Sequence, residues 1–305
     1  MPLISGVGTV AGLGKESTYG TAESRTRWVA LNGTTLTQTA RQRTARGALG
    51  KPKGFVASRF VTANEVGGTL TVPASYSGLG LLLEATLGSV SGTGPYTFAA
   101  GEVAAIPSLT IEQIVGNSGK SEVYAGCKVN TATLSVSPGG EVTWAFDLIG
   151  STKATANTAG SSSVGTPVAV EAFEAAVTYG GSSVDLKRDL TITINNALSR
   201  RQRVGSLNTA EPTVEGNREC TVVLPVDKQA FANRVTELAD GAADLVVTLT
   251  DTATGAKTIV ITVSCQLKSD EQIGTSMGVL ADGLTFESVG LPEIVITNGE
   301  ATYDV

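Results

Sequence analysis

The chain has 305 residues, of which 41% are hydrophobic, 5% aromatic and 16% charged, with a formal net charge of −6 and no histidine. Without histidine the commonest general base and the commonest zinc ligand are absent, which argues against an enzyme and against a zinc protein. The net acidity argues against a protein whose main task is to grip nucleic acid, because phosphate contacts need clustered Lys and Arg.

The first half of the chain predicts strands, a basic segment and one helix. A strand over residues 34–40 leads into a basic stretch that also contains Gly and Pro, which predicts a long mobile loop or hairpin arm. A strand over residues 69–72 then ends at Pro73, and residues 76–87 place leucines at helical spacing. The basic residues of this first arm are Arg41, Arg43, Arg46, Lys51, Lys53 and Arg59.

Period-two alternation is strongest in the middle of the chain. Residues 131–136 and 142–148 both alternate, and the turn sequence Ser-Pro-Gly-Gly lies between them, which predicts a hairpin. Further strands are expected at residues 109–115, 190–194, 221–226, 245–250, 259–267 and 293–297.

The second half of the chain repeats the order of the first. A strand over residues 190–196 leads into a second basic stretch, and a strand ending at Pro225 leads into a helical pattern over residues 228–239. Pro73 and Pro225 align with each other, about half the chain apart. The basic residues of this second arm are Arg200, Arg201 and Arg203.

This order predicts a tandem duplication of a β-rich unit. Residues 151–167 are rich in Ser, Thr, Ala and Gly, as connecting segments often are. We therefore expect a first unit over residues 1–152, a linker over residues 153–167 and a second unit over residues 168–305.

Several chemical sites are not expected. Cys127, Cys220 and Cys265 lie far apart, which disfavours a disulfide framework or a zinc site and favours small buried hydrophobes at Cys220 and Cys265. The glycine-rich residues 6–15 and 116–121 lack the spacing of a phosphate-binding loop. No apolar run reaches the roughly 20 residues that cross a bilayer. We expect no enzyme activity, no catalytic residue, no cofactor, no metal and no membrane contact.

An ordered set of motifs resembles the tail tube, or major tail, proteins of siphophages, the long-tailed bacteriophages. It comprises GKESTYGT at residues 14–21, GGTL at 67–70, YSGLGLL at 76–82, YAGCKVN at 124–130, PGG at 138–140, FDLIG at 146–150, DLTITINN at 189–196 and GS at 205–206. One departure is Arg218-Glu219, where the pattern of Gly67-Gly68 would place glycine.

The resemblance implies a mainly β fold of two tandem antiparallel β-sandwich or barrel units, each with one short flanking α-helix. It implies a structural virion protein, assembled in the host cytoplasm, that polymerises into stacked rings forming the tail tube for DNA ejection. The implied partners are other copies of the chain, the tape measure protein, tail tip or terminator proteins, and DNA that passes without tight binding. The basic residues of both arms are predicted to lie at subunit interfaces.

Two alternatives stay open at this point. A sixfold ring needs six units, so three chains are enough when each chain carries two units. The alternative is a hexamer in which both halves of each chain form one larger domain. A β-sandwich adhesin or carbohydrate-binding module would also explain the strands, although the low aromatic content counts against it.

Overall fold

The computed structural model describes residues 10–45, 58–102, 106–114, 120–156, 169–184, 186, 188–227, 241–273 and 281–298. Most of these residues lie in antiparallel strands, and the one α-helix among them is α1 (Gly80–Leu87). The predicted mainly β fold is therefore confirmed. Within these ranges no helix has the length and apolar character needed to cross a membrane.

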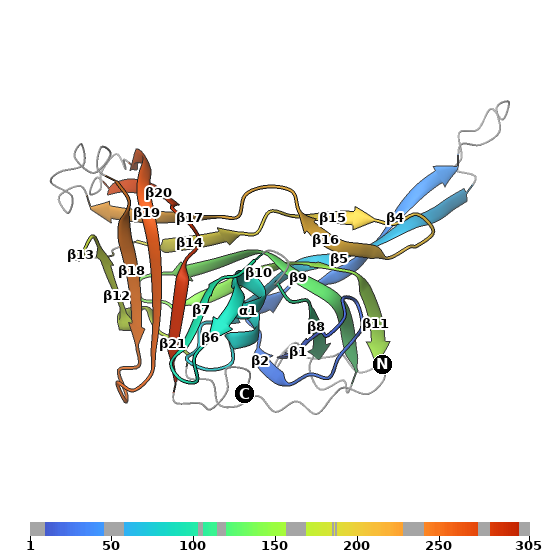
Figure 1. Cartoon of the computed structure of the whole chain (residues 1–305), viewed down its shortest axis with the longest axis horizontal. Helices are drawn as coiled ribbons and strands as arrows, with labels where there is room; N and C mark the ends of the chain where they lie inside the picture. Colours follow the sequence, from blue (N-terminus) through green and yellow to red (C-terminus); the bar gives the residue numbers. More distant parts are fainter. Residues whose placement is uncertain are drawn as a thin grey trace.

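Eight strands form one continuous sheet along the molecule, which we call the long sheet (Figure 1). All its neighbours are antiparallel. In spatial order the strands are β4 (Thr37–Ala45), β5 (Ser58–Pro73), β10 (Thr143–Gly150), β9 (Ser121–Val136), β14 (Leu190–Asn195), β17 (Glu219–Asp227), β20 (Ala281–Ser288) and β19 (Thr258–Ile273). The short β3 (Gly33–Thr34) precedes β4 and also pairs with β5.

The strands β9 and β19 are long enough to leave the long sheet and join further strands. The first part of β9 pairs with β8 and β11, and β8 continues to β1 and β2. The first part of β19 pairs with β18 and β21, and β18 continues to β12 and β13. The bounds are β1 (Val10–Lys15), β2 (Arg27–Ala30), β8 (Leu109–Ile114), β11 (Thr152–Ala156), β12 (Ala175–Tyr179), β13 (Ser182–Val184), β18 (Ala243–Thr250) and β21 (Glu293–Thr297).

The two halves of the chain follow the same strand order. The first runs β2–β1–β8–β9–β10–β5–β4, and the second runs β13–β12–β18–β19–β20–β17–β14. Each half has a register shift between its two long-sheet hairpin strands. In β10 the shift falls between Asp147 and Leu148, and in β20 it falls between Thr285 and Phe286. These two pairs of residues therefore occupy equivalent positions in the two halves.

The register corrects the equivalence that the sequence suggested for the two prolines. Pro73 lies opposite Thr143, whereas Pro225 lies opposite Gly283. Because Thr143 corresponds to Ala281 by the shared register shift, the counterpart of Pro73 is Asp227, which lies opposite Ala281. Similar residues around each proline suggested an alignment that is shifted by two positions. A shift of two residues keeps every side chain on the same face of the strand, so the alternation of apolar and polar residues does not reveal it.

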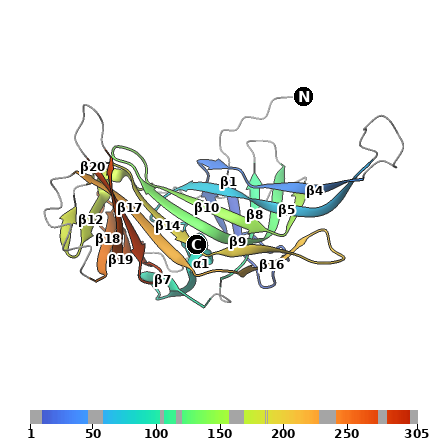
Figure 2. The ribbon, with the colours of Figure 1, turned by 90° about the horizontal axis from the view of Figure 1, so that it is seen from above.

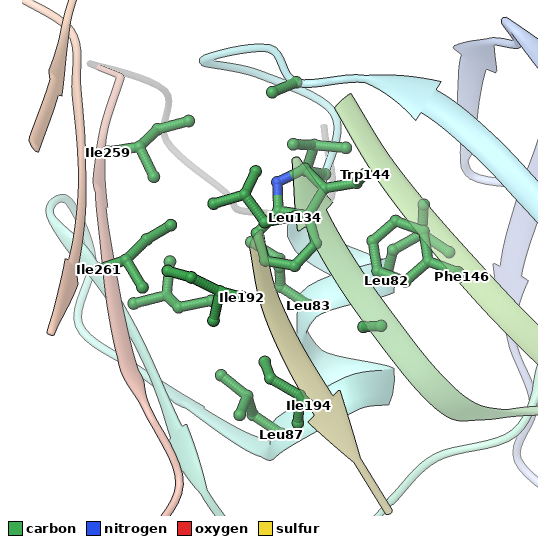
Figure 3. Packing of buried hydrophobic residues seen from close by; sticks show 14 of the residues in the cluster. Leu82, Leu83, Leu87, Leu134, Trp144, Phe146, Ile192, Ile194, Ile259 and Ile261 are labelled. Atoms are coloured by element: carbon green, nitrogen blue, oxygen red, sulfur yellow. The ribbon is translucent and has the colours of Figure 1, made fainter. Parts of the chain in front are cut away.

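The helix α1 packs across the buried face of the long sheet, and every one of its residues is buried. Its leucines meet side chains of both halves of the chain (Figure 3). The helix begins at Gly80 rather than at residue 76, because Gly78 has a φ of +94°, which breaks the helical backbone. The second predicted helix, residues 228–239, lies outside the described residues.

Two hairpins project toward the same end of the molecule (Figures 1 and 2). We call the outer part of the β4–β5 hairpin the first arm; the second arm is the hairpin of β15 (Leu198–Gln202) and β16 (Thr209–Val214). Beside α1, β6 (Gly88–Ser91) pairs with β7 (Tyr96–Ala100), and β7 pairs with β21. The predicted linker begins as strand β11; its residues 157–167 lie outside the described ranges.

Candidate assembly surfaces

One face of the long sheet is covered by hydroxyl side chains. Strand alternation buries large apolar residues such as Phe146 and Ile192 on one face and leaves half-buried polar residues on the other. We call this second face the threonine face. Thr133 and Thr193 lie side by side on it, with their Oγ1 atoms 3.5 Å apart. Its hydroxyl residues include Thr69, Thr71, Thr131, Thr133, Ser135, Thr143, Thr191, Thr193, Thr221 and Thr285.

The threonine face also carries charge, mostly negative. Asp147, Glu219 and Glu287 share its strand alternation, in β10, β17 and β20. Lys268 stands at the register shift of β19 and forms an ion pair with Glu287. The hydrogen bond to Glu287 raises the pKa of Lys268, so this lysine stays charged and offsets one carboxylate. Ala145 and the exposed Val223 also lie on this face, so it is mostly polar and weakly acidic with a small apolar part.

The long sheet ends in two open edges. Among the described strands, β4 pairs only with β5, and residues 269–273 of β19 pair only with β20. In the middle of the sheet the edges of the two halves are paired with each other, because residues 131–136 of β9 pair with residues 190–195 of β14. We call this internal β9–β14 pairing the seam between the two halves. An open strand edge presents unpaired N–H and C=O groups and is a site for pairing with another chain.

The predicted basic residues of the first arm are exposed where the structure describes them. Arg41 and Arg43 lie in β4 and Arg59 lies in β5. The Arg41 guanidinium is 3.8 Å from a carboxylate oxygen of Glu65, and its side chain is 74% exposed. Of the two predicted forms, a mobile loop or a hairpin arm, residues 41–45 adopt the hairpin arm, because they pair with β5. Arg46, Lys51 and Lys53 lie outside the described residues.

The second arm lies against the first. Arg200 donates a hydrogen bond of 2.6 Å to the carbonyl of Val66 and lies 3.3 Å from the second carboxylate oxygen of Glu65. The N–H of Asn64 donates to the carbonyl of Leu207 at 2.7 Å. Glu65 therefore joins Arg41 and Arg200, one from each arm. Sequence reasoning placed these arginines on arms but had no signal that the arms meet.

The exposed basic and apolar residues of the two arms gather at their outer parts. Arg201 and Arg203 of the second arm are exposed, as are Val204 and Leu207 beside them. In the first arm Phe60 is 58% exposed and Val61 is 44% exposed. Exposed apolar side chains grouped with positive charge are typical of a protein interface.

Arg218 joins the two halves of the chain. Its guanidinium donates to the carbonyls of Thr86 and Leu87 at 3.0 Å, to the carbonyl of Gly101 at 2.9 Å and to Oδ1 of Asn196 at 2.8 Å. The first two carbonyls belong to the last turn of α1, where no donor within the helix remains and positive charge is favourable; they also accept from the side-chain amide of Asn196 and from the N–H of Gly101, respectively. The sequence marked Arg218 only as a departure from glycine, so its role was missed.

The GKESTYGT motif has a structural reason in this fold. The Glu16 carboxylate is buried and accepts four hydrogen bonds: from the N–H of Gly20 and of Gly126, and from the hydroxyls of Ser108 and Thr110, at 2.7–2.9 Å. It thereby ties the chain that follows β1 to β8 and β9. A buried carboxylate is tolerated only with this degree of hydrogen bonding, so the motif is a structural anchor.

The described part of the chain carries neither a metal-binding cluster nor a cysteine thiol of lowered pKa. No group of three or more His, Cys, Asp or Glu side chains is placed to hold a metal there. Cys127, Cys220 and Cys265 are free and buried, as predicted for the latter two. Burial raises the pKa of the Cys220 thiol to about 12 and that of Cys265 to about 11, which makes both poor nucleophiles at neutral pH.

A protein-family model described as phage tail tube protein matches residues 6–288 of the chain, which is most of its length. A search of curated proteins found no match. The family match agrees with the resemblance carried by the sequence motifs and favours it over the adhesin alternative.

Proposed function

Because this chain belongs to the phage tail tube protein family, a structural component of the virion and not an enzyme, we propose that its copies join edge to edge into rings. Stacked rings then form the tube through which DNA is ejected. The observation that carries this proposal is the long sheet, which has one polar face and two open edges. A ring closes those edges, and a closed sheet removes the aggregation hazard that open edges create.

The threonine face lines the lumen in this proposal. Hydroxyl groups bind water well and carry no charge. The carboxylates of Asp147 and Glu219 repel phosphate, whereas the charge of Glu287 is offset by Lys268. DNA therefore passes without tight binding.

Charge reversal on the threonine face is expected to convert a passive channel into a DNA-binding one. Tubes of a variant with Asp147, Glu219 and Glu287 replaced by Lys should retain double-stranded DNA at low salt and release it as salt rises. Cosedimentation of tubes with DNA measures this. The matched control reverses three charges on the outer strands and loops, Glu102, Asp244 and Glu293. Equal retention by both variants would place the lumen elsewhere.

We propose further that the two halves are tandem tail-tube units, with a first unit over residues 1–152, a linker over residues 153–167 and a second unit over residues 168–305. The repeated strand order and the matching register shifts support this. Two units per chain make a ring of three chains with pseudo-sixfold symmetry, instead of six whole chains.

The expected result for an assembled tube is threefold symmetry with six similar densities per ring. Each chain should supply two neighbouring densities, because the seam holds its halves side by side. Cryo-electron microscopy without imposed symmetry measures this. Six whole chains in one ring would contradict the three-chain ring and would weaken the tandem-unit proposal.

The arms are the proposed contacts between copies in adjacent rings. Their basic residues Arg41, Arg43, Arg46, Lys51, Lys53, Arg59, Arg200, Arg201 and Arg203 would meet acidic surface on the neighbouring copy, in keeping with the net charge of −6. Arg200 already pairs with Glu65 of its own chain, which favours a role for this residue in aligning the arms. At its ends the tube would meet the tail tip and terminator proteins, and it would enclose the tape measure protein.

A further inference from the structure

The seam is a complete example of two tail-tube units joined by strand pairing, and it lies inside one chain. Its register sets Thr131 opposite Asn195, Thr133 opposite Thr193 and Ser135 opposite Thr191. The threonine face continues across the seam, since the hydroxyls of Thr133 and Thr193 are in contact.

The β9 side of the seam has a counterpart in the second half of the chain. The register shift sets Asp147 opposite Thr131 in β9 and the equivalent Thr285 opposite Ser269 in β19. Thr131 therefore corresponds to Ser269, and the seam edge of β9 corresponds to residues 269–273 of β19.

The β14 side of the seam has a counterpart in the first half. Thr193 of β14 lies opposite Thr221, and Thr37 of β4 lies opposite Gly67. By the shared register shift, Ile149 of β10 and Glu287 of β20 occupy equivalent positions. Gly67 lies opposite Ile149 and Thr221 lies opposite Glu287, so Gly67 and Thr221 are equivalent too. Thr37 therefore corresponds to Thr193.

These counterparts are the two open edges of the long sheet. The counterpart of the β9 edge is residues 269–273, and the counterpart of the β14 edge is residues 35–39, around the start of β4. Thr35, Thr37 and Thr39 are all exposed. Among the described strands, each edge lacks the strand partner that its counterpart has in the seam. Leu36 is the exception within the 35–39 edge, because its N–H donates to Oγ1 of Thr34 and its C=O accepts from the Tyr124 hydroxyl. The two edges are also complementary, because they correspond to opposite sides of the same junction.

We infer that residues 269–273 of one copy pair antiparallel with residues 35–39 of the next copy, in the register of the seam. Ser269 then faces Thr39, Glu271 faces Thr37, and Ile273 faces Thr35. The occupant of each open edge is thus a second copy of this chain. The inference rests on the proposed ring-forming function and specifies its interface. The contact is head-to-tail, so it closes into a ring only when the rotation per chain divides a full turn.

A cysteine pair tests the register. Thr37→Cys with Glu271→Cys places the two thiols at the positions that Thr193 and Thr133 occupy in the seam, where side chains meet. Copper phenanthroline and oxygen oxidise two adjacent thiols to a disulfide, with loss of two protons and two electrons. The native cysteines are buried and do not compete. We expect most of the assembled chains to shift from monomer to covalent dimers and trimers on a non-reducing denaturing gel.

Two further variants serve as controls. Thr133→Cys with Thr193→Cys should form the same bond within one chain, which shows that the fold and the oxidation are intact. Gln38→Cys with Glu271→Cys sets the thiols on opposite faces of the proposed junction and should not cross-link, because neighbouring residues in a strand point to opposite faces.

The outcomes separate this inference from the function on which it rests. Rings or tubes in electron micrographs without a 37–271 cross-link, while 133–193 forms, would overturn the register and leave the ring proposal standing. Preferential cross-linking of the 38–271 pair would show a register slipped by one residue and also overturn it. A folded chain that forms neither rings nor tubes would overturn both.

Discussion

Replacing Arg218 with alanine is expected to lower the free energy of unfolding by about 2–3 kcal/mol. The guanidinium donates to three backbone carbonyls and to the side-chain oxygen of Asn196. Two of these carbonyls, those of Thr86 and Leu87, keep a second donor when the guanidinium is removed. Without it the last turn of α1 loses its positive partner at a site where water is largely excluded. Urea denaturation followed by circular dichroism measures the loss.

Two control variants separate this geometry from simple loss of charge. Arg218→Lys keeps the charge but cannot reach four acceptors at once, so its loss of stability should be intermediate. Arg203→Ala removes an exposed guanidinium and should change the unfolding free energy by no more than about 0.5 kcal/mol. If Arg218→Ala behaved like Arg203→Ala, the junction between the halves would not depend on this residue.

Replacing Arg41, Arg43 and Arg46 together with alanine is expected to abolish tube formation while the monomer stays folded. Arg41 and Arg43 are exposed, and the Arg41–Glu65 pair at 3.8 Å is a solvated one, which contributes little to stability. Charge-assisted hydrogen bonds to a neighbouring copy would be lost. Electron microscopy shows whether tubes form, and circular dichroism shows whether the monomer stays folded.

The matched control for the arm is the triple lysine variant. Lysine preserves the charge and most of the length, so partial assembly is expected if charge is the main attraction, although lysine lacks the bidentate geometry of arginine. Tubes of normal length from the triple alanine variant would show that the first arm is not an assembly contact.

The strands that alternate strongly were predictable from sequence. The predicted strand at residues 293–297 has the bounds of β21, and the predicted hairpin at residues 131–148 is formed by β9 and β10. These segments bury one face completely, so their alternation is sharp. By contrast β20 was not predicted, because its apolar positions are only Leu284 and Phe286, next to turn-like residues.

The pairing between distant segments could not be predicted in the same way. Alternation shows which face a strand buries but not which strand lies beside it, so nothing in residues 190–195 pointed to residues 131–136. Arg200 and Arg218 illustrate the same limit for side chains. Arg200 was predicted as part of a basic arm, and Arg218 was noticed only as a departure from glycine. Their partners, Glu65 and the end of α1, belong to the other half of the chain.

The seam also bears on how quickly rings can start to form. Because β9 and β14 belong to one chain, their pairing is completed in a first-order folding step that is independent of protein concentration. Joining separate copies carries a translational and rotational entropy cost of several kcal/mol per contact. A three-chain ring carries that cost for two associations, because its third junction closes within one assembly, whereas a ring of six separate units carries it for five. Ring nucleation should therefore depend on a lower power of subunit concentration than it would for a ring of six separate units.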